Sequence, residues 1–242
     1  MLEIRNLVKI YGNSFKAVDD LSLVVNDGEI FGFIGPNGAG KTTTIKSIMG
    51  LIKYNSGTIT FNGLNVLEKP LEVKKQIAYI PDNPDIYDNL TGLQYLNFIA
   101  DIYDISLTER NADIKKYASL FEISSNLGDL ISSYSHGMKQ KLSLISAFIR
   151  HPKLLILDEP FVGLDPKAAH DVKEIMKQMC SEGTSVFFST HVLEVAEKLC
   201  DRVGIIKEGR MVAYGRMEDV KGNQSLEEVF LEIADDNYKE NK

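Results

Sequence analysis

Cysteine is scarce in this sequence, and long apolar runs are missing. Only Cys180 and Cys200 occur among the 242 residues, and they fit neither a disulfide framework nor the spacing of a zinc site. The longest apolar runs are short, such as LLIL at 154–157, whereas a membrane-spanning helix needs about 18 apolar residues. The N-terminus also lacks the apolar region of a signal peptide. We therefore expect a cytoplasmic protein with reduced cysteines, which would need another chain to anchor it at a membrane.

Positive charge is also in deficit. The chain has 27 Lys and Arg against 34 Asp and Glu, for a formal net charge of −7. This balance argues against a nucleic-acid-binding surface as the main purpose of the protein. With 44% hydrophobic residues, a chain of this length can bury one sizeable core, with or without a subdomain.

The spacing of apolar residues changes along the chain. The first 35 residues and the stretch 57–66 have the patterns and turn residues of short strands. Residues 89–121 have helical spacing, with Thr91 and Thr108 as expected N-caps. These patterns predict an antiparallel β region at the start of the chain, followed by a helical segment.

Strands and helices alternate from residue 153 onward. LLIL and SVFFST are short, wholly apolar segments, typical of strands in a parallel sheet that is covered on both faces. The sequence therefore predicts an α/β fold whose parallel core is split by the helical insertion. We expect residues 234–242 to form a frayed polar tail.

The segment GPNGAGKTT at 35–43 follows the apolar strand IFGFI and opens a helix with an apolar stripe. This strand–loop–helix order is the setting of a P-loop, in which backbone N–H groups and a helix N-terminus surround phosphate oxygens. We expect Lys41 to reach the β- and γ-phosphates and the Thr42 hydroxyl to bind Mg²⁺. A plain glycine-rich turn would explain the glycines but not this context. The candidate nucleotide-binding residues are Gly35, Pro36, Asn37, Gly38, Ala39, Gly40, Lys41, Thr42 and Thr43.

Two acidic residues follow the strand LLIL. Asp158 and Glu159 come at its carboxyl end, which is the edge where α/β folds bind ligands. Asp158 suits a Mg²⁺ site, and Glu159 could act as general base toward a water molecule. A plain acidic strand exit before Pro160 is the alternative. His191 ends the next apolar strand at the same edge, where it could contact a γ-phosphate, although such a histidine is more often structural.

The ordered motifs GPNGAGKTT, YSHGMKQK, LLILDEP, GLDP and STH resemble those of the ATP-binding subunits of ABC transporters, over about residues 2–233. The resemblance implies a P-loop NTPase fold: a RecA-like core, an N-terminal antiparallel β subdomain, and a helical subdomain inserted at about 84–150. The ATP-binding domain would span 1–233.

The resemblance also implies an ATPase with ATP and Mg²⁺ as cofactors. A second ATP-binding subunit, expected to be an identical copy, would close head to tail with the first on two ATP molecules. The pair would drive a separate membrane-spanning permease, expected to be an ABC-2-type exporter, from the inner face of the cell membrane.

The family pattern assigns further roles at matched positions. Tyr11 resembles the aromatic residue that stacks on adenine, and His191 the histidine that senses the γ-phosphate. Ser135 and Gly137 match the segment that holds the γ-phosphate of ATP bound to the partner subunit. Asp165, in GLDP, would cap a helix and contact the other subunit.

Two residues depart from the family pattern. Asp82 stands where a glutamine usually contacts Mg²⁺ and couples to the permease. Aspartate is shorter and anionic, so a role at the metal and a plain surface turn both remain open. His136 stands where the family has glycine, and we expect His136→Gly to preserve folding and ATP-dependent closure.

Two other functions compete with this interpretation. A soluble ABC-type ATPase of translation or DNA repair usually has two nucleotide-binding halves or a long coiled-coil insertion, and this chain shows one P-loop and no sustained heptads. A non-hydrolysing, nucleotide-gated module is disfavoured by Lys41, Asp158, Glu159 and His191. The sequence does not identify the transported cargo.

Overall fold

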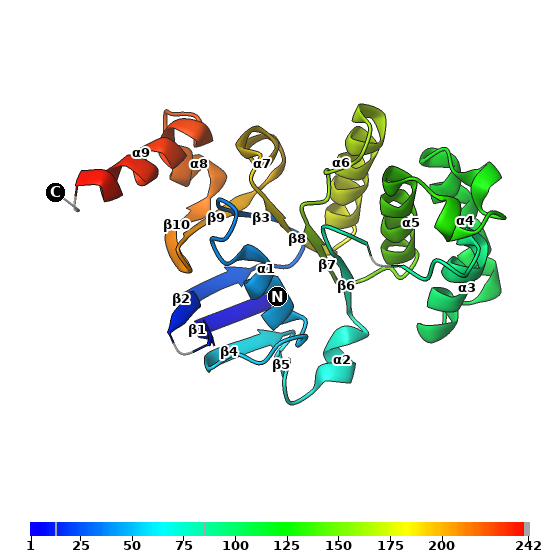
Figure 1. Cartoon of the computed structure of the whole chain (residues 1–242), viewed down its shortest axis with the longest axis horizontal. Helices are drawn as coiled ribbons and strands as arrows, with labels where there is room; N and C mark the ends of the chain where they lie inside the picture. Colours follow the sequence, from blue (N-terminus) through cyan, green and yellow to red (C-terminus); the bar gives the residue numbers. More distant parts are fainter. Residues whose placement is uncertain (13, 85, 240–242) are drawn as a thin grey trace.

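The computed structural model describes residues 1–12, 14–84 and 86–239, and its first layer is an antiparallel sheet near the N-terminus (Figure 1). The order of the strands in this sheet is β2-β1-β4-β5. These strands are β1 (Leu2–Tyr11), β2 (Phe15–Val25), β4 (Ser56–Phe61) and β5 (Leu64–Asn65). The predicted antiparallel region is therefore present.

The second sheet forms the centre of the molecule, in the order β10-β9-β3-β8-β7-β6. Its strands pair in parallel except for β10, which runs antiparallel to β9. These strands are β3 (Ile30–Ile34), β6 (Ile77–Ile80), β7 (Leu154–Asp158), β8 (Ser185–Thr190), β9 (Arg202–Lys207) and β10 (Arg210–Arg216). Strands that pair in parallel are far apart in the chain, so helices cross between them.

Both faces of this central sheet are covered. On one face Phe33 and Phe187 pack toward the antiparallel sheet and helix α1 (Lys41–Ile48). On the other face Leu157 and Phe188 pack under α5 (His136–Phe148), α6 (Pro166–Ser181) and α7 (Leu193–Leu199). Because successive side chains of a strand point to opposite faces, a strand covered on both sides must be apolar throughout. This confirms the interpretation of LLIL and SVFFST.

Three helices, α3 (Gly92–Ile102), α4 (Leu107–Leu120) and α5, lie in the chain between the adjacent strands β6 and β7. Figure 1 shows them grouped at one end of the molecule, on the far side from the C-terminus. Two 3₁₀ turns, Ser124–Asn126 and Ile131–Ser133, precede α5. The fold is thus the predicted α/β P-loop architecture with an antiparallel sheet beside it.

The expected helix starts were half right. Thr91 caps α3 and forms a capping box with Gln94. The prediction of Thr108 as an N-cap was wrong, because Ser106 caps α4 in a capping box with Glu109. A serine followed three residues later by glutamate satisfies two N–H groups reciprocally. Thr108 has no acidic residue at that spacing.

The prediction of a frayed tail was also wrong as far as residue 239. Helix α9 runs from Leu226 to Lys239, after the short helices α2 (Pro70–Lys74) and α8 (Met217–Lys221). Ser225 exchanges hydrogen bonds with Glu228 at the start of α9, and Leu226 is fully buried. A capped and docked first turn lets the helix extend into polar sequence. Residues 240–242 lie outside the described part of the chain. Within the described part, no helix is long and apolar enough to cross a membrane.

Candidate active site

The predicted catalytic segments follow strands that are neighbours in the central sheet. The order β3-β8-β7-β6 places the loop after β3, His191 after β8, Glu159 after β7 and Asp82 after β6. These strands are parallel, so all four segments meet at one edge of the sheet. The edge predicted from the sequence is therefore the one that the fold assembles.

Backbone geometry fixes the loop between β3 and α1. Gly40 has a φ of 109°, and a β-carbon there would collide with the carbonyl oxygen of Ala17. The Ala39 N–H donates to the Pro36 carbonyl at 3.1 Å, and the Gly209 N–H donates to the Ala39 carbonyl at 2.9 Å. Only glycine fits at position 40, and the two hydrogen bonds hold the loop in this shape.

A cavity of about 270 Å³ lies over this loop. Two of the nine predicted P-loop residues, Gly35 and Ala39, are buried and do not line this cavity. Asp158, Glu159, Asp82 and Tyr11 line the cavity as well. The loop residues that line it are Pro36, Asn37, Gly38, Gly40, Lys41, Thr42 and Thr43.

The Lys41 side chain is a buried cation held inside this loop. It is only 6% exposed, and its Nζ donates to the carbonyl oxygen of Gly35 at 2.6 Å. The Oε1 atom of Glu159 lies 3.6 Å from the same nitrogen. A buried charge must be compensated, and these oxygens occupy donors that a phosphate could use.

Asp158 and Thr42, the two expected Mg²⁺ ligands, are in direct contact. Thr42 Oγ1 donates to Asp158 Oδ2 at 2.8 Å, and the Ser189 hydroxyl donates to Oδ1 of the same carboxylate. Burial raises the pKa of Asp158, the hydrogen bonds from Ser189 and Thr42 oppose that rise, and the charge of Asp82 adds to it. This carboxylate is thus a buried anion that a cation would stabilise.

The contact between Thr42 and Asp158 fits a magnesium site shared with a nucleotide. Mg²⁺ usually takes one or two protein oxygens and completes its shell with phosphates and water. The Thr42 hydroxyl and the Asp158 carboxylate are oxygen ligands of this kind, and they lie together at the phosphate loop.

Glu159 adopts a backbone conformation that is rare for any residue but glycine, with φ 49°. Its N–H donates to the carbonyl and hydroxyl oxygens of Ser189, both at 3.2 Å. The Oε1 atom lies 3.0 Å from Nδ1 of His191 but is buried without a hydrogen bond. A left-handed conformation costs about 1–2 kcal/mol, and here it places the carboxylate oxygen near both Lys41 and His191 at the site.

Ser189 was missed in the sequence. It lies within SVFFST and looks like one more buried strand residue, but in the register of β7 and β8 it is opposite Asp158. It bonds both Asp158 and the backbone of Glu159. Only the strand pairing reveals this double role.

Two exposed aromatic side chains form the rim of the cavity. Tyr11 is 41% exposed and pairs across the strands with Phe15, which is 63% exposed. The Nζ atom of Lys9 lies 4.6 Å from the centre of the Tyr11 ring. Large aromatic side chains left in water are typical of binding surfaces. Phe15 was missed because it comes just after a turn, where an isolated aromatic residue gives no pattern.

Ser135 and Gly137 lie elsewhere. Ser135 caps α5 by accepting the Met138 N–H at 3.3 Å. Neither residue lines the cavity over the P-loop. One chain therefore does not bring these two residues to its own phosphate loop.

Asp82 lies at the cavity but has a local partner. Its Oδ1 accepts the N–H of Asn83 at 2.8 Å, as in a surface turn. Its charge still acts on the site, because it adds to the effect of burial in raising the pKa of Asp158. The metal role of Asp82 stays a prediction.

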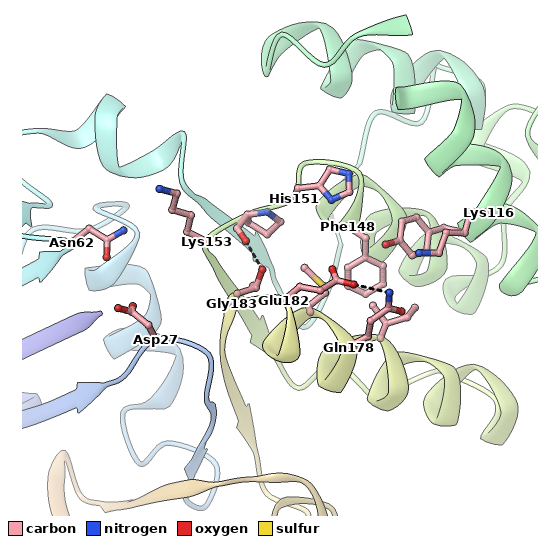
Figure 2. Close-up of a pocket in the computed structure, with 14 residues that line it drawn as sticks. Asp27, Asn62, Lys116, Phe148, His151, Lys153, Gln178, Glu182 and Gly183 are labelled. Atoms are coloured by element: carbon pink, nitrogen blue, oxygen red, sulfur yellow. Dashed lines mark hydrogen bonds between the residues drawn. The ribbon is translucent and has the colours of Figure 1, made fainter. Parts of the chain in front are cut away.

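A larger cavity, of about 590 Å³, is shown in Figure 2. Lys153 and Thr184 line it and directly precede β7 and β8, so it lies at the amino edge of the sheet. Glu182 and Gln178, joined by a hydrogen bond of 2.8 Å, form another wall. None of the predicted site residues lines this cavity, and it is separate from the phosphate loop.

Comparisons with known proteins identify the family of this chain. The model of the ABC transporter family matches residues 18–162. The linearmycin resistance ATP-binding protein LnrL of Bacillus subtilis (strain 168) is 37% identical over 223 residues, which cover 91% of this chain and 70% of that protein. The bacitracin transport ATP-binding protein BcrA of Bacillus licheniformis is 38% identical over 213 residues, which cover 88% of this chain and 68% of that protein.

Solved structures show the same relationship. A structure of an ATP-binding subunit of an ABC transporter has a TM-score of 0.93 at 36% identity, covering 97% of this chain and 99% of that one. An ATP-binding cassette dimer bound to ADP and phosphate has a TM-score of 0.81 at 21% identity, covering 90% and 99%, and shows the shared fold. The chain therefore belongs to the ABC transporter family, as an ATP-binding subunit that binds ATP with Mg²⁺ and hydrolyses it to ADP and phosphate.

Proposed function

We propose that two copies of this chain close head to tail on two ATP molecules and thereby drive export through a separate membrane permease. The observation that carries this proposal is the position of Ser135 and Gly137. They lie at an exposed helix start, outside the cavity of their own chain. A helix N-terminus favours an anion, and the second copy would supply it as the γ-phosphate on its own P-loop.

The residues at the cavity divide the chemistry among them. Lys41 would exchange its carbonyl partners for phosphate oxygens, and Thr42 and Asp158 would hold Mg²⁺, which neutralises charge on the phosphates. The Glu159 carboxylate would accept a proton from the attacking water, as general base. His191, 3.0 Å away, would keep Glu159 in place and contact the γ-phosphate.

An exposed apolar patch lies around the start of α3 and supports a permease partner. Tyr87, Leu93 and Phe98 are each more than 40% exposed, and the Tyr87 and Phe98 rings meet edge to face at 5.7 Å. Side chains of this kind suit a protein interface. Through this patch the subunit would attach to the permease, at the inner face of the membrane. Asp82 lines the cavity and precedes the patch residues in the sequence, and it would couple the permease to the ATP site.

Export is supported by the names of two relatives, a linearmycin resistance ATP-binding protein and a bacitracin transport ATP-binding protein. We propose export for this chain, with an ABC-2-type permease as the partner. The cargo would be recognised by the permease.

The experiment is to measure molar mass in solution with a variant that binds ATP but does not consume it. Glu159→Gln with Mg²⁺-ATP, run through size exclusion with light scattering, should double its mass from 27.1 kDa. ADP should leave it monomeric, and so should ATP when Ser135→Arg is added. A monomer in the presence of saturating ATP would contradict head-to-tail closure.

A further inference from the structure

The ring of His136 lies against Gly163, in the segment that follows Glu159. A β-carbon at Gly163 would be 2.6 Å from Cδ2 and 3.0 Å from Nε2 of His136. The backbone at Gly163 also has φ 79°. Glycine is therefore required there both for this backbone conformation and for the space that the ring occupies. The imidazole thus occupies the space over the α-carbon of Gly163, and its contact is with its own chain.

Two more contacts join the start of α5 to this segment. A β-carbon at Gly137 would lie 2.9 Å from the carbonyl oxygen of Gly163, so helix and loop are in close contact. One turn further on, Lys141 Nζ lies 2.8 Å from Asp165 Oδ2. The other oxygen of Asp165 accepts the Ala168 N–H at 2.8 Å and caps α6. The helix start is therefore attached to the loop by three contacts, two at Gly163 and one at Asp165.

The same loop is attached to the catalytic edge at its other end. The backbone of Glu159 is bonded to Ser189, and the Val162 N–H donates to the Glu159 carbonyl at 3.2 Å. The Phe161 ring packs edge-on against Phe188 of β8, with centroids 6.0 Å apart. A short segment held by turns and packing at both ends moves little within itself, so a shift of one end reaches the other.

We propose that His136 is a positioning residue for Glu159. By packing on Gly163, it makes the start of α5 and residues 159–165 one unit. Ser135 and Gly137, which would contact the ATP of the partner subunit, are then joined to the general base of their own chain. Closure on one ATP thereby places the carboxylate that acts on the other. This inference rests on the proposed head-to-tail dimer.

Steady-state hydrolysis by the full chain tests the role of His136. His136→Ala removes the ring, and we expect kcat to fall about tenfold while KM for ATP stays within about twofold. ATP-dependent dimerisation, measured in the Glu159→Gln background, should persist, because the Ser135 cap and the helix backbone remain. The matched control is His170→Ala, the same change at an exposed position on α6, and it should keep the wild-type kcat.

A double-mutant cycle tests the contact itself. Gly163→Ala adds a methyl group against the ring and strains the backbone, so it should also lower kcat. Combined with His136→Ala, the clash is relieved while the backbone strain and the loss of the ring contact remain, so the double variant should be at least as fast as Gly163→Ala alone. The backbone term is common to both arms and cancels. Independent multiplication of the two losses would overturn the proposal.

Other results of these experiments would contradict the positioning role. An unchanged kcat in His136→Ala would refute the positioning role. A rise in KM, or loss of the ATP-bound dimer, would show that His136 contacts nucleotide instead. Failure of the proposed dimer is recognised separately. If Glu159→Gln with an intact His136 does not dimerise on ATP, the head-to-tail function fails, whatever the His136 variants do.

Discussion

The ammonium nitrogen of Lys41 lies 3.6 Å from Oε1 of Glu159, so the expected phosphate-binding cation and the expected general base are in contact. Both side chains are largely buried, at 6% and 15% exposure. An incoming phosphate would take Lys41 from Gly35 and Glu159 and leave the carboxylate free to face water. The site is thus arranged so that binding ATP prepares the base.

Replacing Lys41 should remove most of the affinity for ATP. A hydrogen bond to a charged group contributes about 1.5–3 kcal/mol, so Lys41→Ala should weaken binding about ten- to hundredfold in a direct titration. Lys46→Ala is the control, because Lys46 lies on the same helix and is exposed. Equal affinities for the two variants would show that Lys41 is structural.

Replacing Glu159 should stop hydrolysis without harming binding. General base catalysis contributes about 10²- to 10⁴-fold, so phosphate release by Glu159→Gln should drop by that factor while the Kd for ATP is unchanged. Glu194→Gln changes an exposed glutamate that pairs with Lys198 on α7, and it should release phosphate at the wild-type rate. Steady hydrolysis by Glu159→Gln would assign the base elsewhere.

The rim aromatics should contribute by stacking on the base of the nucleotide. Tyr11→Ala should weaken ATP binding by about 1–3 kcal/mol, and Tyr11→Phe should bind like the wild type because the ring remains. Phe15→Ala should weaken binding too, since the exposed Phe15 ring lines the same cavity. A triphosphate without a base would separate the effects: its affinity should be the same for all variants.

Asp158 should destabilise the nucleotide-free chain at neutral pH. Burial raises its pKa above the ordinary 3.8, so the folded chain holds this proton to a higher pH than the unfolded chain. Stability from this group is therefore lost as pH rises from about 4 through the folded pKa. Asp158→Asn removes the charge while keeping partners for Thr42 and Ser189.

Calorimetry in the absence of nucleotide and metal measures this effect. The Tm of Asp158→Asn should exceed that of the wild type by a few degrees at pH 7, and the gap should shrink as the pH is lowered toward about 4. Mg²⁺-dependent hydrolysis should be lost at every pH. A variant less stable than the wild type at pH 7 would show that the Thr42 and Ser189 hydrogen bonds outweigh the burial of the charge.

The parts of the site that sequence could predict are those encoded in contiguous residues. The loop at 35–43 and the pair Asp158–Glu159 each follow an apolar strand, and parallel strands bring such ends to one edge. Ser189 and Phe15 were not predicted, because each reaches the site through strand register: Ser189 lies opposite Asp158, and Phe15 lies opposite Tyr11. No local pattern records a register of that kind.

In the fold, too, features encoded by neighbouring residues could be predicted, and contacts between distant residues could not. The apolar strand LLIL and the Thr91 cap were predicted from neighbours in sequence. The start of α4 was misplaced because two hydroxyl residues compete there, and the glutamate at 109 decides in favour of Ser106. His136 could be seen to be unusual, but the sequence did not show that its ring packs on Gly163, since that contact depends on how α5 meets the loop after β7.

The central claim is that the P-loop of one chain works with Ser135 of another. The most direct measurement mixes two inactive variants, Lys41→Ala and Ser135→Arg, and records ATP hydrolysis. In a head-to-tail dimer the mixed pair contains one intact site, so activity should return, up to about a quarter of the wild-type rate from random pairing. A mixture no more active than its two components would mean that each chain completes its own site, and would contradict the account.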